Sequence, residues 1–178
     1  PTTCRRQRQM CIRDSVNRED GFIGTSLRRE EYVEDCSDID DIIVFTSNGD
    51  MIVTKVDSKK FVAKNILYVS VFKKRDSRTI YNMIYKEGKS GVSYIKRFNV
   101  TGVTRDKTYN LTSQNPKTKI LHFSANPNGE AEIVTIQLRQ SGSIKKLKWD
   151  LDFADLAIKG RSVTVSYTHL RAHETIPD

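Results

Sequence analysis

The chain has 178 residues and a formal net charge of +8, and 37% of its residues are hydrophobic. That length and apolar content suffice for one domain with a buried core, and no run of 18 apolar residues is present that could span a membrane. Three cysteines, an odd number without tight spacing, argue against a disulfide framework and favour a reducing compartment.

Both ends of the chain look foreign to the fold. Residues 1–15 and 165–178 have no apolar period, and their segments RQRQMCIRDS and SYTHLRAHET resemble translations of sequencing-adapter DNA. We therefore expect both ends to be disordered and the native domain to occupy residues 16–164. A natural basic arm and a natural tail are the alternative.

Charge is distributed unevenly along the chain. Residues 17–50 hold 3 basic and 10 acidic side chains, a net charge of −7, whereas residues 51–161 hold 22 basic and 9 acidic ones, a net charge of +13. A surplus of that size indicates a polyanionic partner such as nucleic acid. A soluble surface that is merely basic is the alternative.

An acidic run, residues 30–41, precedes the first predicted hairpin. Clustered carboxylates can bind magnesium. The run lacks the glycine turn of a calcium loop and has no partner motif, so a solvated loop is the preferred prediction.

The first strong strand signal is that hairpin. Asp41–Phe45 and Met51–Val56 are short runs rich in β-branched residues, and Asn48-Gly49 lies between them. This dipeptide predicts a type I′ turn, in which both central residues have positive φ. A lysine-rich connector then leads to another predicted strand, residues 65–72.

Two further hairpins are predicted downstream. The first joins residues 79–85 to residues 92–98, and the second joins residues 119–123 to residues 131–138 through Asn128-Gly129. Each hairpin is followed by a polar connector rich in lysine or arginine. Apolar strands with basic connectors predict a packed interior and basic loops.

The hairpins recur at a regular interval. The aromatic residues that close their first strands, Phe45, Tyr85 and Phe123, are 40 and 38 residues apart. A β-rich repeat of this length is typical of radially arranged blades; a simple sandwich with regular hairpins is the alternative. We therefore predict an all-β, propeller-like fold of about three four-stranded blades, a partial array whose outermost strands lack neighbours.

Four longer phrases resemble a known family. They are residues 24–32 (GTSLRREEY), 97–105 (RFNVTGVTR), 123–131 (FSANPNGEA) and 149–161 (WDLDFADLAIKGR). These phrases resemble the C-terminal domain of the A subunit of bacterial type IIA topoisomerases, DNA gyrase and topoisomerase IV, in a form similar to that of Bacteroidetes. The resemblance covers residues 17–162.

The resemblance implies a β-pinwheel, a propeller-like disc whose basic rim bends duplex DNA and presents it for ATP-dependent strand passage. The implied partners are duplex DNA, the catalytic core and the B subunit of the parent enzyme, in the bacterial cytoplasm near the nucleoid. The nucleophilic tyrosine, Mg²⁺ and ATP act elsewhere in that enzyme, so no active site, cofactor, membrane or small-molecule substrate is expected for this chain. The gyrase box QRRGGKG is missing, which leaves gyrase and topoisomerase IV both open and favours bending or docking over tight wrapping.

Basic residues, mostly of the connectors, are the candidate DNA contacts. Cations that recur once per blade would follow a curved edge, and counterion release would give affinity with little dependence on base identity. The prediction depends on the set as a whole, because any single lysine is expected to be an ordinary surface residue. The predicted contacts are Lys73, Lys74, Arg75, Arg78, Lys96, Arg97, Arg105, Lys107, Lys145, Lys146 and Lys148.

Other chemistry is less favoured by the sequence. Cys36 and His122 could form a nucleophile–base pair, but nothing orients them, so both are predicted to be structural. No Walker loop, dinucleotide fingerprint or zinc spacing occurs. A β-propeller that serves as a protein-interaction scaffold is the alternative function. Five aromatic residues are predicted to pack in the core rather than stack on bases: Tyr81, Tyr85, Tyr94, Phe98 and Phe123.

Overall fold

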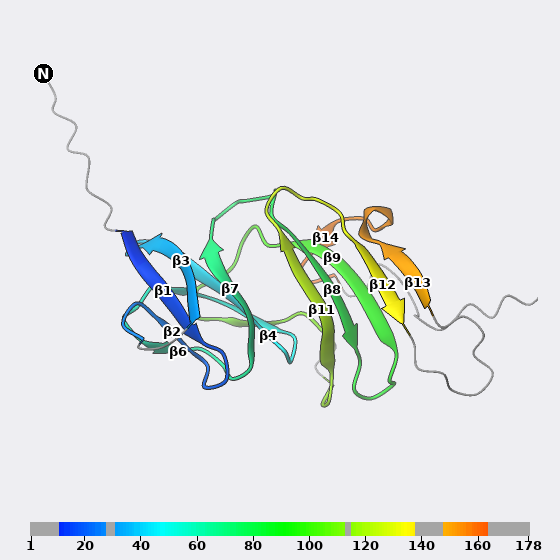
Figure 1. Cartoon of the computed structure of the whole chain (residues 1–178), viewed down its shortest axis with the longest axis horizontal. Coiled ribbons are helices and arrows are strands. Elements are labelled where there is room, and N and C mark those ends of the chain that lie inside the picture. The colour runs from blue at the N-terminus through cyan, green and yellow to red at the C-terminus, as the bar shows by residue number, and fades with distance from the viewer. Residues whose placement is uncertain (1–10, 28–30, 113–114, 138–147, 164–178) are drawn as a thin grey trace, which may run out of the picture. The chain divides into compact units, whose positions relative to one another are not determined.

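The fold consists almost entirely of β-strands (Figure 1). In the described residues of this computed structural model, fourteen strands form four sheets, and the one helical element is the short 3-10 helix η1 (Phe153–Asp155). The predicted all-β fold with four-stranded sheets is therefore confirmed. The described residues are 11–27, 31–112, 115–137 and 148–163.

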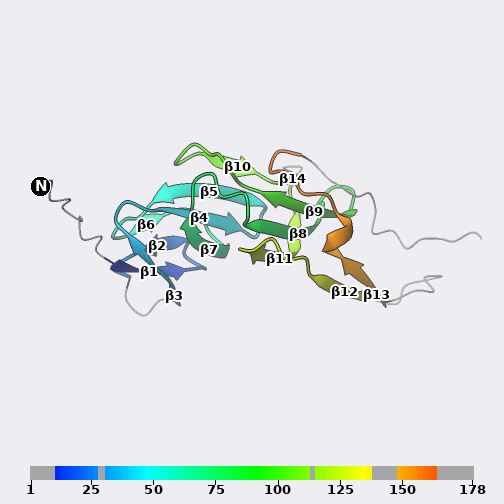
Figure 2. The same ribbon diagram turned by 90° about the horizontal axis from the view of Figure 1, so that it is seen from above.

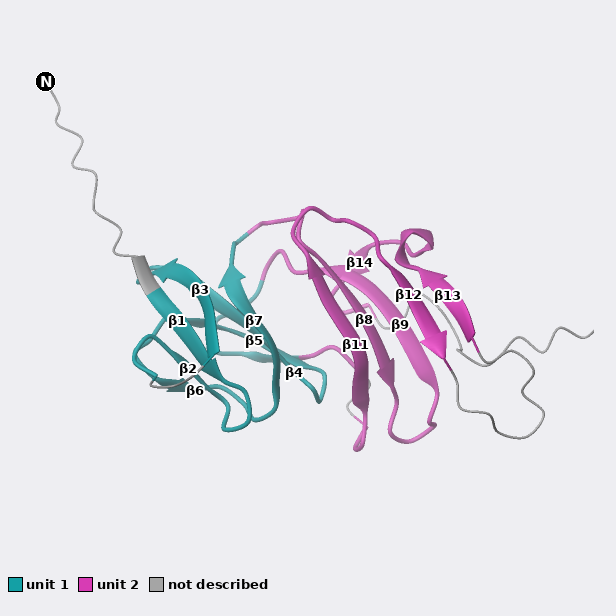
Figure 3. Ribbon diagram, viewed as in Figure 1, with its two compact units in different colours: residues 1–74, 103–109 teal, residues 75–102, 110–178 magenta. Residues whose placement is uncertain are grey.

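The chain divides into two compact units (Figure 3). Unit 1 comprises residues 1–74 and 103–109, and unit 2 comprises residues 75–102 and 110–178. Each unit contains two sheets, apart from the last residue of β10, which belongs to unit 2.

Unit 1 contains the first and second sheets. The first sheet has the order β3-β1-β2-β6 and comprises β1 (Cys11–Asn17), β2 (Phe22–Gly24), β3 (Glu31–Ser37) and β6 (Lys60–Phe61). The second sheet has the order β10-β5-β4-β7, which Figure 2 shows from above. It comprises β4 (Asp41–Thr46), β5 (Asp50–Lys55), β7 (Ile66–Phe72) and β10 (Thr108–Asn110).

Unit 2 contains the third and fourth sheets. The third sheet has the order β11-β8-β9-β14 and comprises β8 (Ile80–Lys86), β9 (Ser93–Asn99), β11 (Lys119–Asn126) and β14 (Lys159–Gly160). The fourth sheet pairs β12 (Ile133–Gln137) with β13 (Lys148–Asp152).

The strand orders follow one repeated plan. In each of the first three sheets a hairpin forms the centre, and a third strand from the same repeat flanks it on one side. The strand on the other side is β6, β10 or β14, and it follows the next hairpin along the chain. In each four-stranded sheet, one of the two outer strands therefore comes from the following repeat. We reserve the name edge strands for these three strands, β6, β10 and β14.

Each unit has its own apolar core. In unit 1, Val16 and Ile23 of the first sheet pack with Ile42 and Val44 of the second. All six residues of β4 are buried, which explains why this strand is a continuous apolar run without alternation. In unit 2, Ile84 and Ile95 of the β8–β9 hairpin cluster with Phe153 and Leu156.

The first two predicted hairpins are confirmed, because β4 pairs with β5 and β8 pairs with β9. The predicted type I′ turn is wrong. Gly49 has a φ of 91°, whereas Asn48 is not among the residues with positive φ. The N–H of Gly49 donates to the carbonyl oxygen of Thr46 at 3.1 Å, so the strands are joined by a three-residue loop that ends in a left-handed glycine.

The third predicted hairpin is wrong. Residues 119–126 form β11, which pairs with β8 in the third sheet, and β12 pairs with β13 instead. Asn128-Gly129 still makes a turn, with a φ of 71° at Gly129, but this turn joins strands of two different sheets. Phe123 therefore does not correspond to Tyr85, and their 38-residue spacing is not the repeat period.

Two expectations about the N-terminal region are also corrected. Residues 11–15, expected to be disordered, belong to β1 and pair with β3. The acidic run, expected to be a loop, contains β3 and ends at Asp41, which is buried at the start of β4. Since β3 is the outer strand of its sheet, its acidic side chains can remain in solvent while the backbone pairs.

Candidate nucleic-acid interface

Each edge strand has an exposed lysine at its start or immediately before it. Lys59 precedes β6, Lys107 precedes β10 and Lys159 begins β14. An edge strand has one side without a sheet neighbour, so side chains there meet solvent. Among the described residues no acidic side chain forms an ion pair with these three, which we name the edge lysines.

The first edge lysine is held against aromatic rings. The Nζ atom of Lys59 lies 4.6 Å from the centre of the Phe22 ring. Phe22 in turn contacts Phe61 edge-on, with the ring centres 5.5 Å apart, and Phe61 is 53% exposed. The cation–π contact positions the ammonium group at the surface without neutralising its charge.

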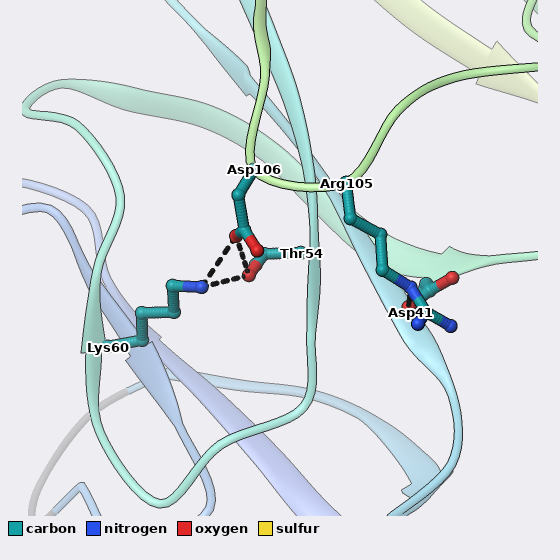
Figure 4. A network of polar contacts seen from close by, with 5 residues as sticks. All are labelled: Asp41, Thr54, Lys60, Arg105 and Asp106. Atoms are coloured by element: carbon teal, nitrogen blue, oxygen red, sulfur yellow. Dashed lines mark hydrogen bonds and ion pairs between the residues drawn. The ribbon is translucent and has the colours of Figure 1, made fainter.

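Lys60, the next residue, has a structural role in unit 1 (Figure 4). Its Nζ lies 2.6 Å from Oδ1 of Asp106 and 2.5 Å from Oγ1 of Thr54, which donates to the same carboxylate oxygen at 2.7 Å. The hydrogen bond from Lys60 is the largest cause of the lowered pKa of Asp106. These contacts fasten the connector that precedes β10 to β5 and β6.

Arg105 lies beside this network and is also ion-paired (Figure 4). Its Nε lies 2.7 Å from Oδ1 of the buried Asp41, and its side chain is 44% exposed. Arg105 therefore compensates a buried carboxylate at the start of β4. Lys107, two residues further on, is exposed, and its Nζ lies 5.4 Å from the centre of the Tyr109 ring.

The connector between β7 and β8 holds four predicted DNA contacts. The carboxylate of Asp76 accepts hydrogen bonds from the hydroxyl of Thr79 at 2.7 Å and from the N–H of Arg78 at 2.9 Å, and these bonds lower its pKa. The connector is thus ordered through Asp76, while its basic side chains stay in solvent. All four contacts are exposed: Lys73, Lys74, Arg75 and Arg78.

Two of the predicted DNA contacts, Lys96 and Arg97, are not at the surface. Both belong to β9, and their exposures are 2% and 7%. Arg97 donates through Nη1 to the carbonyl oxygens of Phe153 and Leu156, at 3.0 and 3.3 Å, and through Nη2 to that of Gly129 at 3.2 Å. The guanidinium therefore holds unit 2 together, and its burial removes it from the surface that could meet a phosphate.

Lys96 is buried in the same manner. Its Nζ donates to the carbonyl oxygens of Leu111 at 3.1 Å and Arg161 at 2.5 Å. Burial disfavours the charged form and lowers the pKa of Lys96 to about 8. The ammonium group thus joins β9 to two segments that lie far from it in sequence.

The chain matches a known protein family over nearly all of its described residues. Residues 15–164 match the sequence model of a family described as the topoisomerase C-terminal domain of Bacteroidota. The chain belongs to this family. The predicted resemblance to the C-terminal domain of a topoisomerase A subunit is thereby confirmed.

One relative of this topoisomerase C-terminal domain is the A subunit of DNA topoisomerase 4 from Borreliella burgdorferi (strain ATCC 35210 / DSM 4680 / CIP 102532 / B31). The two are 30% identical over 113 residues, which cover 63% of this chain and 18% of the relative. The chain therefore matches less than a fifth of that protein's length. No solved structure matches the chain.

Other lysines of this topoisomerase C-terminal domain also bear on the predicted contacts. Lys145 and Lys146 lie outside the described residues, and Lys148 is exposed at the start of β13. Lys59 and Lys159 were not among the predicted contacts, because β6 and β14 are two residues long and too short to show a strand period in the sequence. It also missed four exposed lysines at one end of the third sheet: Lys86, Lys89, Lys117 and Lys119.

The other candidate groups of the domain make local contacts. Cys36 is buried in β3, and burial raises the pKa of its thiol to about 11. His122 Nε2 lies 2.9 Å from Oε1 of Glu132. Within the described ranges, no three His, Cys, Asp or Glu side chains gather as a metal site would require, and no helix is long and apolar enough to cross a membrane.

Proposed function

We propose that this topoisomerase C-terminal domain binds duplex DNA through the phosphate backbone and bends it, in support of ATP-dependent strand passage by other parts of a type II topoisomerase. The observation that carries the proposal is the recurrence of an exposed, acid-free lysine beside each edge strand. A cation close to the start of each edge strand suits a polyanion whose charges also repeat, and it provides no means of reading base edges.

The contacts proposed for the backbone are the three edge lysines and the four exposed cations of the β7–β8 connector. Each phosphate contact releases counterions, so the logarithm of affinity falls with the logarithm of salt concentration by about 0.9 per contact. Bending a duplex costs on the order of 1–6 kcal/mol, so several such contacts are needed to offset it.

The proposal is of bending or docking of DNA rather than tight wrapping, because the gyrase box does not occur in this chain; a gyrase whose box lies outside it stays an open alternative. On this view the protein partners are the B subunit of the parent enzyme and its catalytic core, which supply the tyrosine chemistry, Mg²⁺ and ATP hydrolysis. Gyrase and topoisomerase IV both remain compatible parents.

The test measures the affinity of the 178-residue chain for two unrelated 30-base-pair duplexes at a series of salt concentrations. Fluorescence anisotropy of the labelled duplexes reports binding. We expect equal affinities for the two duplexes and a log–log slope of about −4.5 to −6.3 for five to seven contacts. End-labelled duplexes should show increased energy transfer when they bend. No affinity, or a slope near zero, would reject DNA binding and favour the protein-interaction scaffold.

A further inference from the structure

Four exposed lysines gather at the end of the third sheet where β8 turns into β9. Lys86 ends β8, Lys89 lies in the turn, Lys117 precedes β11 and Lys119 begins it. No ion pair or hydrogen bond holds any of their ammonium groups within the described part of the chain. We name these residues the four-lysine platform.

The register of the sheet places two of these charges against each other. Lys119 of β11 is the cross-strand partner of Lys86 of β8. Directly opposite residues have Cβ atoms about 4.5–5.5 Å apart, and like charges in this position destabilise a sheet. Folding therefore gains nothing from this pair, whereas an anion bound between the two ammonium groups would be stabilised by both.

The backbone beneath the lysines is locked in place. The N–H of Gly88 donates to the hydroxyl of Thr118 at 3.1 Å, and the amide of Asn115 donates to Oε1 of Glu87 at 2.6 Å. A Cβ atom on Gly88 would lie 1.8 Å from the carbonyl oxygen of Pro116, so the two segments are in direct contact. Glu87, the one acidic residue of this turn, accepts hydrogen bonds from the amide of Asn115 and from the hydroxyl of Ser90.

The platform lies far from the edge lysine of the same sheet. β11 and β14 are the outer strands of the third sheet, roughly 14 Å apart at about 4.8 Å for each strand step. Along the strands, Lys159 pairs with Phe98 of β9, and Phe98 pairs with Tyr81 near the start of β8. Lys86 lies at the other end of β8. The two groups of cations therefore occupy different corners of one sheet.

We propose that the four-lysine platform is a second phosphate-backbone site of unit 2, separate from the edge strand, and this inference rests on the proposed DNA binding. The choice of a nucleic acid over a folded protein follows from composition. The described part of the chain has one exposed large hydrophobic side chain near the platform, Leu121, which lies two residues beyond Lys119 in β11 and is 59% exposed, and it has none between residues 86 and 119. Protein interfaces are depleted in lysine and depend on buried apolar or aromatic anchors.

The test is Lys119→Glu, which replaces the repulsive pair with an attractive one. We expect the Tm to rise by about 1–3 °C, while the log–log salt slope of duplex binding becomes shallower by about 1.8, since Lys86 is then also neutralised. The affinity at 0.1 M salt should fall at least tenfold. A purely structural role would lower the Tm, and an ordinary surface lysine would leave the slope nearly unchanged; either result overturns the proposal.

Two controls accompany this variant. Lys64→Glu makes the same change in net charge at an exposed lysine outside both groups, and its affinity should fall no more than about twofold; an equal loss would mean that net charge explains the effect. Lys86→Ala with Lys119→Ala should give the same change of slope without the new ion pair. If the platform variants bind normally while loss of the edge lysines weakens binding, the inference fails and the proposed function stands; if neither set alters binding, both fail.

Discussion

Two tripeptides of nearly the same sequence occupy opposite environments in this domain. Lys59-Lys60-Phe61 lies at the edge strand β6, where Phe61 is 53% exposed, whereas Lys96-Arg97-Phe98 lies in β9, where Phe98 is fully buried. β9 has a neighbour on each side, β8 and β14, while β6 pairs with β2 alone. Position in the sheet therefore decides whether a cation meets solvent or the carbonyl oxygens of its own chain.

Net charge alone therefore cannot locate the proposed DNA-binding surface. A buried cation contributes to the net charge of +8 as much as an exposed one, yet it is already satisfied by protein acceptors. The cations that can exchange counterions for phosphate are those at the edge strands and in the exposed connectors. Substitutions of single cations separate the two classes.

The largest effect is expected for Arg97→Ala. Its removal takes a donor from the carbonyl oxygens of Phe153, Leu156 and Gly129, of which that of Phe153 keeps a second donor, the N–H of Leu156. It also leaves a cavity in unit 2, so the free energy of unfolding should fall by about 3 kcal/mol or more. Urea denaturation measures this loss. Duplex affinity per folded molecule should not change; a stable variant with weakened DNA binding would show that Arg97 is a contact after all.

A pH-dependent effect of about 3 kcal/mol is expected for Lys96. Because its pKa in the folded chain is lowered to about 8, the folded state releases this proton at lower pH than the unfolded state, whose lysine titrates near 10.5. The wild-type chain should therefore gain stability relative to Lys96→Met as the pH rises from about 8 to 10.5. Urea denaturation of both chains across this range measures the difference, and a constant difference would contradict the burial of a charged Lys96.

Arg105 tests the intermediate case, a half-exposed cation that already has an acidic partner. Arg105→Ala leaves the buried Asp41 uncompensated, so we expect a loss of about 1–2 kcal/mol in the free energy of unfolding. The log–log salt slope of DNA binding should change by less than the value of about 0.9 expected for one phosphate contact. The comparison with Asp41→Asn in the same background, as a double-mutant cycle, isolates the ion pair.

The smallest effects should distinguish the two neighbours within the edge tripeptide. Lys59→Ala should leave stability nearly unchanged and reduce the magnitude of the salt slope by about 0.9. Lys60→Ala should do the reverse, with a loss of about 0.5–1 kcal/mol from the contacts with Thr54 and Asp106 and an unchanged slope. Equal effects of the two variants on the slope would contradict the assignment of Lys59 to DNA binding and of Lys60 to the structure of unit 1.

The local parts of this architecture were predictable from the sequence. Apolar runs separated by glycine-containing turns identified the β4–β5 and β8–β9 hairpins. The edge strands were not predictable, because two or three residues carry no hydrophobic period and their partners lie in the preceding repeat. The turn at Asn128-Gly129 had the same chemistry as a hairpin turn, so turn residues alone could not show that β11 pairs backward with β8.

The candidate site was predictable only in part, for a related reason. Exposure of the β7–β8 connector follows from its polar sequence, whereas burial of Arg97 depends on carbonyl oxygens 56 and 59 residues away. A strand sequence with two adjacent cations gives no sign of such distant acceptors. The like-charged pair of Lys86 and Lys119 was hidden as well, since it exists only in the register of β8 with β11.

The central claim is that exposed cations, the edge lysines among them, contact the phosphate backbone, whereas buried cations do not. Its most direct test is the salt dependence of duplex affinity for a variant with Lys59, Lys107 and Lys159 all replaced by alanine. The account predicts an intact fold, judged by an unchanged Tm, and a log–log slope that is shallower by about 2.7. A folded triple variant whose slope equals that of the wild-type chain would contradict it.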